Sequence, residues 1–422
     1  MFDERRKDRI ATVVIRGGGI LVILAVVAIV VNIGFEALPL FRSAEEGPLE
    51  VVATQARPLA VGSDPRREIV WALQHDGTVD FPEEPSREAV AVAPGPLAAV
   101  DQEIHGLVSL VDGNNTLHVG RLHFRDRWQD GARTTEVSWR AAAEPVPLPP
   151  GMGATGVTAN ADGDGNVAAI AWGAAGDLVL MIWDGDDEQW ELDSSGGLAG
   201  PIEAVAVAED LTRAALIRPD GRLHVFGLEV GRRLQVEGVD GPVAAARFLI
   251  GGGTLVAAGR SGEVDILLEV PRVEVTNNGA KPLKIGGRMI GVAETMVVDD
   301  DQAGRRFSGR DDIEVEPAPA VWRVVRSLQR MDGTPTEIAP GHRRRGFLVG
   351  AEDGTVALYY STSGRRLLAG RWAPEPVAQL ALDPKGDGAV AVIGSRVLRR
   401  EIHNPHPEVS LKTLFLPVWY EG

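Results

Sequence analysis

One short pattern recurs along most of this chain and limits what it can fold into: an apolar strand, a glycine-centred turn, and a second strand with alternating apolar residues. Seven copies can be quoted: EIVWALQHDGTVDF, LVSLVDGNNTLHVGRL, VAAIAWGAAGDLVLMIWD, RAALIRPDGRLHVFGL, TLVAAGRSGEVDILLEV, GFLVGAEDGTVALYYS and GAVAVIGSRVLRREI. Asp-Gly and similar pairs supply the positive φ angles of tight hairpin turns, and the alternation directs one strand face inward. The repeat predicts an all-β fold built from hairpins.

The spacing of the copies suggests how the hairpins are assembled. Gly221 and Gly262 are about 40 residues apart, as are Gly354 and Gly394, and this is the period of a four-stranded propeller blade. Radial stacking gives each small sheet two neighbours and leaves only short edges exposed. We therefore expect a WD40-like β-propeller of about seven blades over residues 50–402. Two β-sandwiches, which use similar strands, are the alternative.

One interval breaks the period. Between Gly262 and Gly354 the spacing is about twice the usual value. This stretch either contains a degenerate blade or is an insertion, so the blade count is seven or eight.

The composition agrees with a turn-rich β-protein and excludes several classes. The chain of 422 residues contains 50 Gly and 27 Pro, and only 5% of it is aromatic, which favours tight turns over long helices. A formal charge of -16 and the lack of a basic stripe interleaved with aromatic residues argue against nucleic-acid binding. Because there is no cysteine, disulfides and thiolate metal sites are excluded.

The N-terminal region predicts a membrane anchor. Residues 1–16 are rich in Arg and Lys, and the run from Gly17 to Phe35 carries no charge, which is long enough to cross the hydrocarbon core. We expect a cytoplasmic N-terminus (1–16), a transmembrane helix (17–38), a linker (39–49) and an extracytoplasmic main domain, because basic flanks stay on the cytoplasmic side. This places the chain in a bacterial inner membrane with its main domain in the periplasm. A cleaved secretory signal is the alternative.

Two acidic stretches have the composition of cation sites. Asn160, Asp162 and Asp164 match the start of a calcium loop, but the twelfth position is Ala171 instead of a bidentate Glu, so a plain turn is favoured. A second acidic stretch, Asp299–Asp301 with Asp311 and Asp312, is interrupted by arginines that offer ion pairs instead.

Histidines and arginines supply the other candidates. His403 and His406 have metal-ligand spacing, but prolines keep their segment extended and no third ligand is near. Arg343, Arg344 and Arg345 could contact an anion or a partner, because guanidinium groups match phosphate oxygens; a surface turn explains them equally well. The P-loop, G-x-S-x-G and H-E-x-x-H motifs are missing from the sequence. We expect neither an enzyme nor a cofactor.

Three segments resemble one family. RRKDRIATVVIRGGGILVILAVVAIVVNIGFEALPLF is similar to the first membrane helix of the long form of the bacterial phosphate ABC-transporter permease (PstC-like). TPTEIAPGHRRRGFLVGAEDGTVALYYSTSGRRLL resembles a late blade of that family's extracytoplasmic insertion, and NPHPEVSLKTLFLPVWYEG resembles the stretch before its second membrane helix. The resemblance implies that residues 403–422 lead toward a permease core, and that this core has no counterpart in the 422 residues.

The resemblance also implies a function. The chain would be the accessory, membrane-anchored part of a phosphate-import permease, acting in docking or regulation and not itself forming the pore. Its implied partners are the membrane, a second permease subunit, ATPase subunits and a periplasmic phosphate-binding protein. The alternatives are a single-pass membrane-tethered scaffold for protein–protein interaction in the cell envelope, or a secreted propeller hydrolase or lactonase with a metal-centred channel.

Overall fold

The computed structural model describes residues 19–31, 44–53, 57–129, 131–193, 200–228, 233–285, 287–300, 310–343 and 345–403. The chain divides into two units, one spanning Glu46–Ile402 and the other containing the remaining residues at both ends. The Glu46–Ile402 unit is here called the β unit. Its regular structure is almost wholly strand, so the expectation of an all-β fold is confirmed.

The strands and the one short helix among them are, in chain order, β1 (Glu45–Ala53), β2 (Ala60–Ser63), β3 (Val70–Leu73), β4 (Thr78–Asp80), β5 (Val90–Ala91), β6 (Leu97–Gln102), η2 (Ile104–Gly106), β7 (Val108–Asp112), β8 (Thr116–Gln129), β9 (Ala132–Ala141), β10 (Val146–Pro147), β11 (Ala154–Ala161), β12 (Val167–Gly173), β13 (Leu178–Asp184), β14 (Gln189–Asp193), β15 (Ala204–Val207), β16 (Arg213–Ile217), β17 (Leu223–Gly227), β18 (Arg233–Glu237), β19 (Val243–Phe248), β20 (Thr254–Gly259), β21 (Val264–Asn277), β22 (Leu283–Ile285), β23 (Arg288–Ile290), β24 (Thr295–Asp299), β25 (Ile313–Ser327), β26 (Pro335–Pro340), β27 (Gly346–Ala351), β28 (Thr355–Tyr360), β29 (Arg365–Arg371), β30 (Val377–Leu382), β31 (Gly388–Ile393) and β32 (Arg396–His403).

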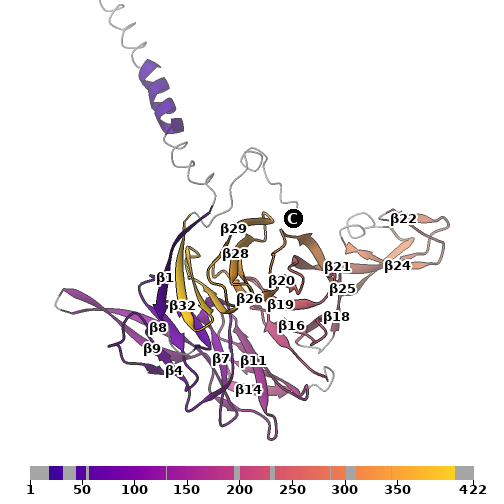
Figure 1. Cartoon of the computed structure of the whole chain (residues 1–422). Helices are drawn as coiled ribbons and strands as arrows, with labels where there is room; N and C mark the ends of the chain where they lie inside the picture. Colours follow the sequence, from indigo (N-terminus) through magenta and orange to yellow (C-terminus); the bar gives the residue numbers. More distant parts are fainter. Residues whose placement is uncertain are drawn as a thin grey trace, which may run out of the picture. The chain divides into compact units, whose positions relative to one another are not determined.

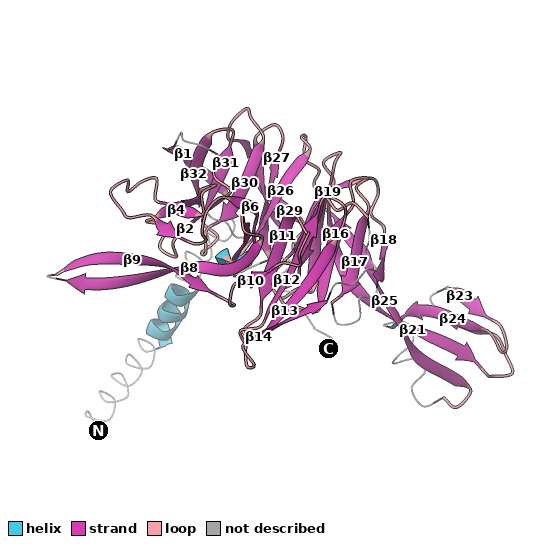
Figure 2. Ribbon diagram, turned by 90° about the horizontal axis from the view of Figure 1, so that it is seen from below, coloured by secondary structure: helices cyan, strands magenta, loops and turns pink. Residues whose placement is uncertain are grey.

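Most of these strands form a series of four-stranded units in which neighbours in sequence are neighbours in space (Figure 2). We number them in chain order: sheet 1 (β2–β5), sheet 2 (β6, β7, β8 and β10), sheet 3 (β11–β14), sheet 4 (β15–β18), sheet 5 (β19, β20, β21 and β25), sheet 6 (β26–β29) and sheet 7 (β30, β31, β32 and β1). The seven hairpins quoted from the sequence are the second and third strands of these sheets, and all are antiparallel as expected.

The first strands of the sheets form a closed cycle. Each first strand contacts the first strand of the next sheet, in the order β2, β6, β11, β15, β19, β26 and β30, and β30 contacts β2 again. Sheets 4 and 5 are also joined at their outer edges, where β18 pairs in parallel with β25. Because β15 and β19 lie against each other as well, this combined sheet curls into a nearly closed, barrel-like arrangement.

Sheet 7 is completed by the beginning of the β unit. β1 pairs with β32, so the first and last strands of the unit lie side by side (Figure 1). The carboxylate of Glu46 accepts a hydrogen bond from the guanidinium of Arg400. The chain therefore enters and leaves the β unit at neighbouring positions.

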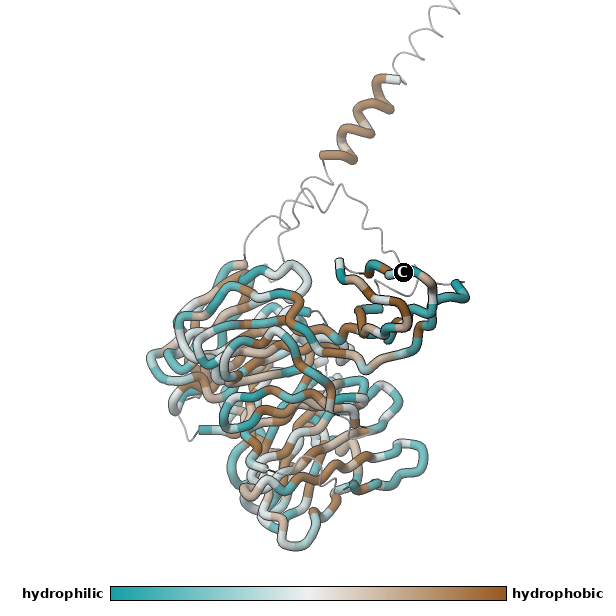
Figure 3. The backbone as a smooth tube through the Cα atoms, turned by 90° about the vertical axis from the view of Figure 1, so that its right-hand side faces the viewer, coloured by the Kyte–Doolittle hydropathy of each residue, from teal (hydrophilic) through white to brown (hydrophobic). Residues whose placement is uncertain are grey.

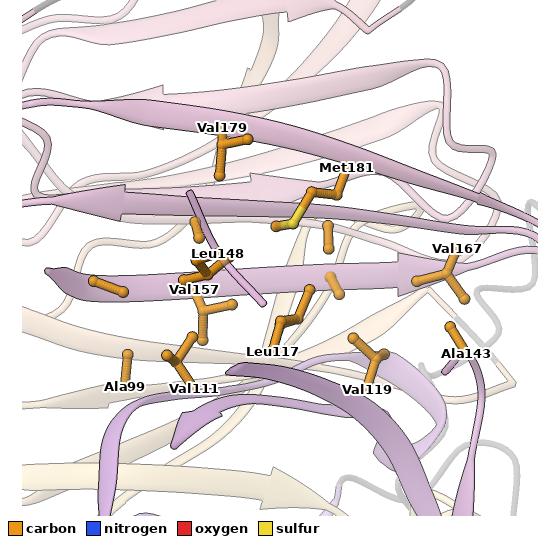
Figure 4. Close-up of a cluster of buried hydrophobic side chains, with 14 of the residues drawn as sticks. Ala99, Val111, Leu117, Val119, Ala143, Leu148, Val157, Val167, Val179 and Met181 are labelled. Atoms are coloured by element: carbon orange, nitrogen blue, oxygen red, sulfur yellow. The ribbon is translucent and has the colours of Figure 1, made fainter. Parts of the chain in front are cut away.

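The hydrophobic cores lie between consecutive sheets. Figure 4 shows one of them, where Leu117 and Val119 of sheet 2 face Val157 and Met181 of sheet 3. Similar clusters join sheet 1 to sheet 2, sheet 3 to sheet 4, sheet 4 to sheet 5, sheet 5 to sheet 6, and sheet 7 to sheet 1. Each sheet is thus apolar on both faces, which accounts for the strongly apolar strands of the repeat.

Tight turns set the register of the hairpins. In the turn between β27 and β28, Gly354 has φ +78°, and a Cβ atom there would lie 1.8 Å from the carbonyl oxygen of Ala373. Asp353 Oδ1 accepts a hydrogen bond from Thr355 N at 3.0 Å. The Asp-Gly pair therefore supplies both the backbone freedom and the cap that this turn needs.

Two ribbons project beyond the sheets. β8 continues past sheet 2 and pairs with β9 as a long hairpin, and β21 and β25 extend to carry β22–β24 (Figure 2). The second ribbon has its own small core, which includes Val275, Ile285 and Ile290. The double-length interval after Gly262 is therefore an insertion within sheet 5, and the described residues there form no additional four-stranded sheet.

Residues 19–31 form a helix that is hydrophobic along most of its length (Figure 3). None of the helices found among the described residues is long and apolar enough to cross a membrane. Both ends of the predicted 17–38 helix (residues 17–18 and 32–38), the basic residues 1–16 and the segment 404–422 lie outside the described residues. These expectations remain predictions.

The core between sheets 2 and 3 gives a first test of the packing. Leu117 is fully buried there, whereas Leu192 on β14 is 49% exposed. Leu117→Ala is expected to lower the free energy of unfolding by about 2–5 kcal/mol, because it removes buried methyl groups and leaves a cavity. Leu192→Ala should change it by less than about 0.5 kcal/mol. Denaturant unfolding of both variants measures the difference; equal effects would contradict this packing.

Candidate functional site

Polar side chains gather where the first strands of the sheets end. Most of the interior of the β unit is apolar, but β6, β19 and β26 each carry a charged residue on the side facing the other first strands. The loops that follow β6, β15 and β26 add two histidines and a glutamate. This end of the cycle therefore holds two adjoining features, a buried ionic cluster and an open pocket.

The ionic cluster is centred on Arg247 of β19. Its Nη2 donates a hydrogen bond to Asp101 Oδ1 of β6 at 2.6 Å and lies 3.7 Å from Glu337 Oε1 of β26. Its Nη1 lies 3.8 Å from Glu103 Oε1. Glu103, which follows β6, also accepts a hydrogen bond from Thr158 Oγ1 at 3.3 Å. Sheets 2 and 5 are not neighbours in the cycle, so the Arg247–Asp101 pair spans its interior.

Three carboxyl groups share this single guanidinium, and two of them hold protons more tightly than usual. Burial raises the pKa of Glu103 to about 8, against the attraction of Arg247. Burial likewise raises the pKa of Glu337 to about 7. Burial alone disfavours the charge of Arg247, but Asp101, Glu103 and Glu337 outweigh it and raise the pKa of Arg247. We infer a cluster in which Arg247 stays charged while the glutamates exchange protons near neutral pH.

The open feature is a cavity of about 490 Å³ at the same end of the first strands. Its basic lining residues are His105, Arg121, His123, His342 and Arg343, and Trp71 and Phe124 form part of its apolar wall. We call it the histidine pocket. It brings together residues from sheets 1, 2, 6 and 7 that are far apart in the sequence.

Two histidines join several sheets at this pocket. The rings of His105 and His342 meet edge to face, with centroids 5.6 Å apart. His105 Nε2 lies 3.1 Å from Glu209 Oε1, and His342 Nε2 donates to the carbonyl oxygen of Leu382 at 3.0 Å. Burial, with His105 nearby, lowers the pKa of His342 to about 4. His342 is therefore neutral at pH 7, and the fixed positive charge at the pocket comes from the arginines.

A buried carboxyl group lies behind the pocket. Ser63 Oγ donates a hydrogen bond of 2.5 Å to Asp383 Oδ1, and burial raises the pKa of Asp383 to about 6. Glu209, beside His105, also accepts a hydrogen bond from Gly251 N at 2.6 Å. Asp383 and Glu209 are thus already engaged by protein donors.

Of the three arginines predicted to contact an anion or a partner, the structure places one at the histidine pocket. Arg343 lines the histidine pocket. Arg345 is exposed, and its carbonyl oxygen accepts hydrogen bonds from Ser361 N and Ser361 Oγ. Arg344 lies outside the described residues. The prediction of an anion or partner contact remains open for Arg343, which gains neighbours that the sequence did not suggest.

The acidic stretch after β11 is a turn, as the sequence favoured. Asp162 Oδ1 accepts hydrogen bonds from Asp164 N and Asn166 N, both at 2.9 Å. Asn160 Nδ2 donates to the carbonyl oxygen of Val207 at 3.0 Å. The side chains of Asp162 and Asn160 are therefore used in closing the turn and joining sheet 3 to sheet 4.

The remaining candidates also make ion pairs or stand apart. Arg323 holds Asp299 through two hydrogen bonds, of 2.8 and 3.2 Å, and lowers the pKa of that carboxyl. Asp312 pairs with Arg310. His403 ends β32, and its predicted companion His406 lies outside the described residues. Across the described part of the chain, no three His, Asp or Glu side chains are grouped to hold a metal ion.

No protein-family model matches this chain, and no curated protein matches it.

Removing the Arg247 charge should destabilise the β unit strongly. Arg247→Met leaves Asp101, Glu103 and Glu337 without their cation, and breaking a buried ion pair from one side costs about 3–5 kcal/mol. The control is Arg222→Met, because Arg222 pairs with Asp220 at the surface and is 78% exposed; its loss should cost less than about 1 kcal/mol. Chemical denaturation at pH 7 compares the two, and equal costs would rule out a structural role for the cluster.

The raised pKa of Glu103 predicts a specific pH dependence. Because its pKa is higher in the folded chain (about 8) than its ordinary value of 4.5, its contribution to stability is complete below that ordinary value and is lost as the pH rises through 8. Between pH 5 and 8, the free energy of unfolding should fall by at most about 1.4 kcal/mol per pH unit on its account. Glu103→Gln should reduce this slope.

Exposed Glu88 provides the matched control. Glu88→Gln should leave the slope as in the parent chain. Denaturant unfolding at several pH values measures all three proteins, and an unchanged slope in Glu103→Gln would show that Glu103 ionises normally. The part of the slope that remains in Glu103→Gln should come from Glu337, whose pKa is also raised. It should be lost when Glu337→Gln is added to Glu103→Gln.

Proposed function

We propose that the β unit is a seven-bladed, WD40-like β-propeller that serves as the extracytoplasmic, accessory part of a phosphate-import permease. In this proposal each of the numbered sheets is one blade. The closed cycle of first strands and the cores between consecutive sheets support the propeller. The completion of sheet 7 by β1 supports ring closure of the kind that propellers need to avoid a free edge.

The observation that carries the functional proposal is the position of the two ends of the β unit. Glu46 and Arg400 are in contact, so the chain enters and leaves the unit side by side. This arrangement suits a domain inserted between two membrane segments of one chain, because both connections must return to the same membrane surface. The family that the sequence resembles carries its large extracytoplasmic domain between its first and second membrane helices, and residues 17–38 would be the first of these helices.

The role that best fits this placement is docking or regulation. A single apolar helix cannot enclose a solvated path for phosphate through lipid. The β unit offers broad loop faces to a second permease subunit or to a periplasmic phosphate-binding protein that delivers the substrate. The two projecting ribbons, β8–β9 and β21–β25, enlarge the surface available for such contacts.

The alternative is a membrane-tethered scaffold for protein–protein interaction in the cell envelope. The same ribbons and faces would serve it equally, and it needs no permease core. The partners recovered from membranes distinguish the two functions.

The proposal predicts which proteins accompany the full chain. When the tagged chain is purified from gently solubilised membranes of its own cells, the permease and ATPase subunits of a phosphate importer should copurify. An unrelated tagged membrane protein at the same abundance controls for non-specific capture. Recovery of envelope-assembly proteins without importer subunits would favour the scaffold instead.

Phosphate uptake tests the role within the importer. Cells whose permease lacks residues 46–402, with assembly verified separately, should still transport phosphate but with altered affinity or regulation. Unaltered uptake at all external phosphate concentrations would contradict the docking and regulatory role. Complete loss of transport by an assembled complex would make the β unit part of the translocation machinery.

A further inference from the structure

The exposed face of β8 has a high density of positive charge for a chain whose net charge is -16. Alternate residues of a strand share a face, and on this face β8 presents Arg121, His123, Arg125 and Arg127, all exposed. Opposite Arg121 in the register lies Arg140 of β9. Like charges placed directly opposite each other on neighbouring strands are destabilising, so this pair has a cost that the fold itself does not explain.

Little on the hairpin offsets this charge. Glu136 lies opposite Arg125 and forms an ion pair with Arg127 at 2.7 Å. Arg121 and Arg140 make no ion pair within the described parts of the chain. The positive charge is therefore concentrated at the base of the hairpin, where β8 leaves sheet 2.

The base of the hairpin is also the wall of the histidine pocket. Arg121 and His123 of β8 line it together with Arg343, His105 and His342. The described lining residues include no Asp or Glu. Arg343, like Arg121, has no ion pair with any described residue.

We propose that the histidine pocket, with Arg121, Arg343 and the adjacent Arg140, is a binding site for a phosphate group. Guanidinium groups donate paired hydrogen bonds that match phosphate oxygens, and an anion held there would relieve the repulsion between Arg121 and Arg140. The pocket is concave and partly walled by Trp71 and Phe124, which reduces competition from water. The inference rests on this geometry alone, so it can hold where the transport proposal fails.

The phosphate group could belong to inorganic phosphate or to an anionic lipid headgroup. An exposed tryptophan on the same hairpin favours the lipid headgroup as a second source. Trp128, near the tip of the same hairpin, is 73% exposed, and tryptophan is favoured at the interface between lipid and water. A hairpin that placed Trp128 in that interface would bring its basic face to the headgroups.

Isothermal titration calorimetry of the purified full chain with inorganic phosphate, at constant ionic strength, tests the first source. Saturable binding is expected, and Arg121→Gln and Arg343→Gln should each weaken it about tenfold or more, because hydrogen bonds to charged groups are strong. Arg288→Gln is the matched control, since Arg288 is exposed on the other ribbon. Both pocket arginines are solvent-facing, so thermal melts should show these variants folded.

Co-sedimentation with vesicles tests the second source. Phosphatidylglycerol vesicles should retain more of the chain than phosphatidylcholine vesicles, and the difference should be lost in Arg121→Gln and Arg343→Gln but kept in Arg288→Gln. If the lipid is the ligand, Trp128→Ala should weaken this retention, while Leu192→Ala, an exposed apolar control, should not.

The outcomes decide between three cases. Arginine-dependent binding of inorganic phosphate supports the site with a free ligand. Arginine-dependent binding of anionic vesicles alone supports it with a headgroup. The proposal is overturned if neither ligand binds, if Arg288→Gln weakens binding as much as the pocket variants do, or if duplex DNA binds equally well, since diffuse charge would then account for the result.

Discussion

The structure depends on one constraint: each small sheet is apolar on both faces, so each needs a neighbouring sheet on either side. A linear stack would leave two apolar faces in water, whereas a closed cycle leaves none. The cores between consecutive sheets and the contact of β30 with β2 meet this requirement. The pairing of β1 with β32 follows from it, because sheet 7 obtains its outer strand from the beginning of the unit. This closure also places Glu46 beside Arg400, on which the proposed insertion between membrane segments depends.

The interior of the cycle is polar in part. Where the first strands converge, a long charged side chain reaches from one strand to others. Arg247 does so, joining β19 to Asp101 of β6 and approaching Glu337 of β26. A buried ion pair is weak evidence for stability, because desolvation offsets much of its attraction. Our hypothesis is that the cluster fixes the arrangement of sheets that do not otherwise touch, which the Arg247→Met and Glu103→Gln comparisons examine.

The sequence predicted the parts of this fold that are local and failed on those that depend on distant contacts. Asp353-Gly354 and the similar pairs in the other copies of the repeat predict hairpins, because the turn itself requires those residue types. The stretch after Gly262 could not be assigned from spacing alone, because an inserted ribbon and a weak blade both lengthen the interval. At the histidine pocket, the sequence predicted Arg343 because it belongs to a basic run. It could not predict His105 and Arg121, which line the same pocket but lie more than two hundred residues away in the chain. The sequence does contain a signal for Arg247, since VAAARFL places a single arginine within an otherwise apolar run.

The distribution of charge decides where a ligand or partner should be sought. Acidic residues outnumber basic ones over the whole chain, so most of its surface repels anions and gives them no reason to collect there. Against that background, the arginines at the base of β8 and beside the pocket form a local region of opposite sign, and a field of this kind directs an anion to one place. An acidic segment of a docking protein would be steered to the β8–β9 hairpin by the same field. Positive charge left unpaired in an acidic chain, at a concave site made by four sheets, is therefore more informative about function than the apolar framework that holds it.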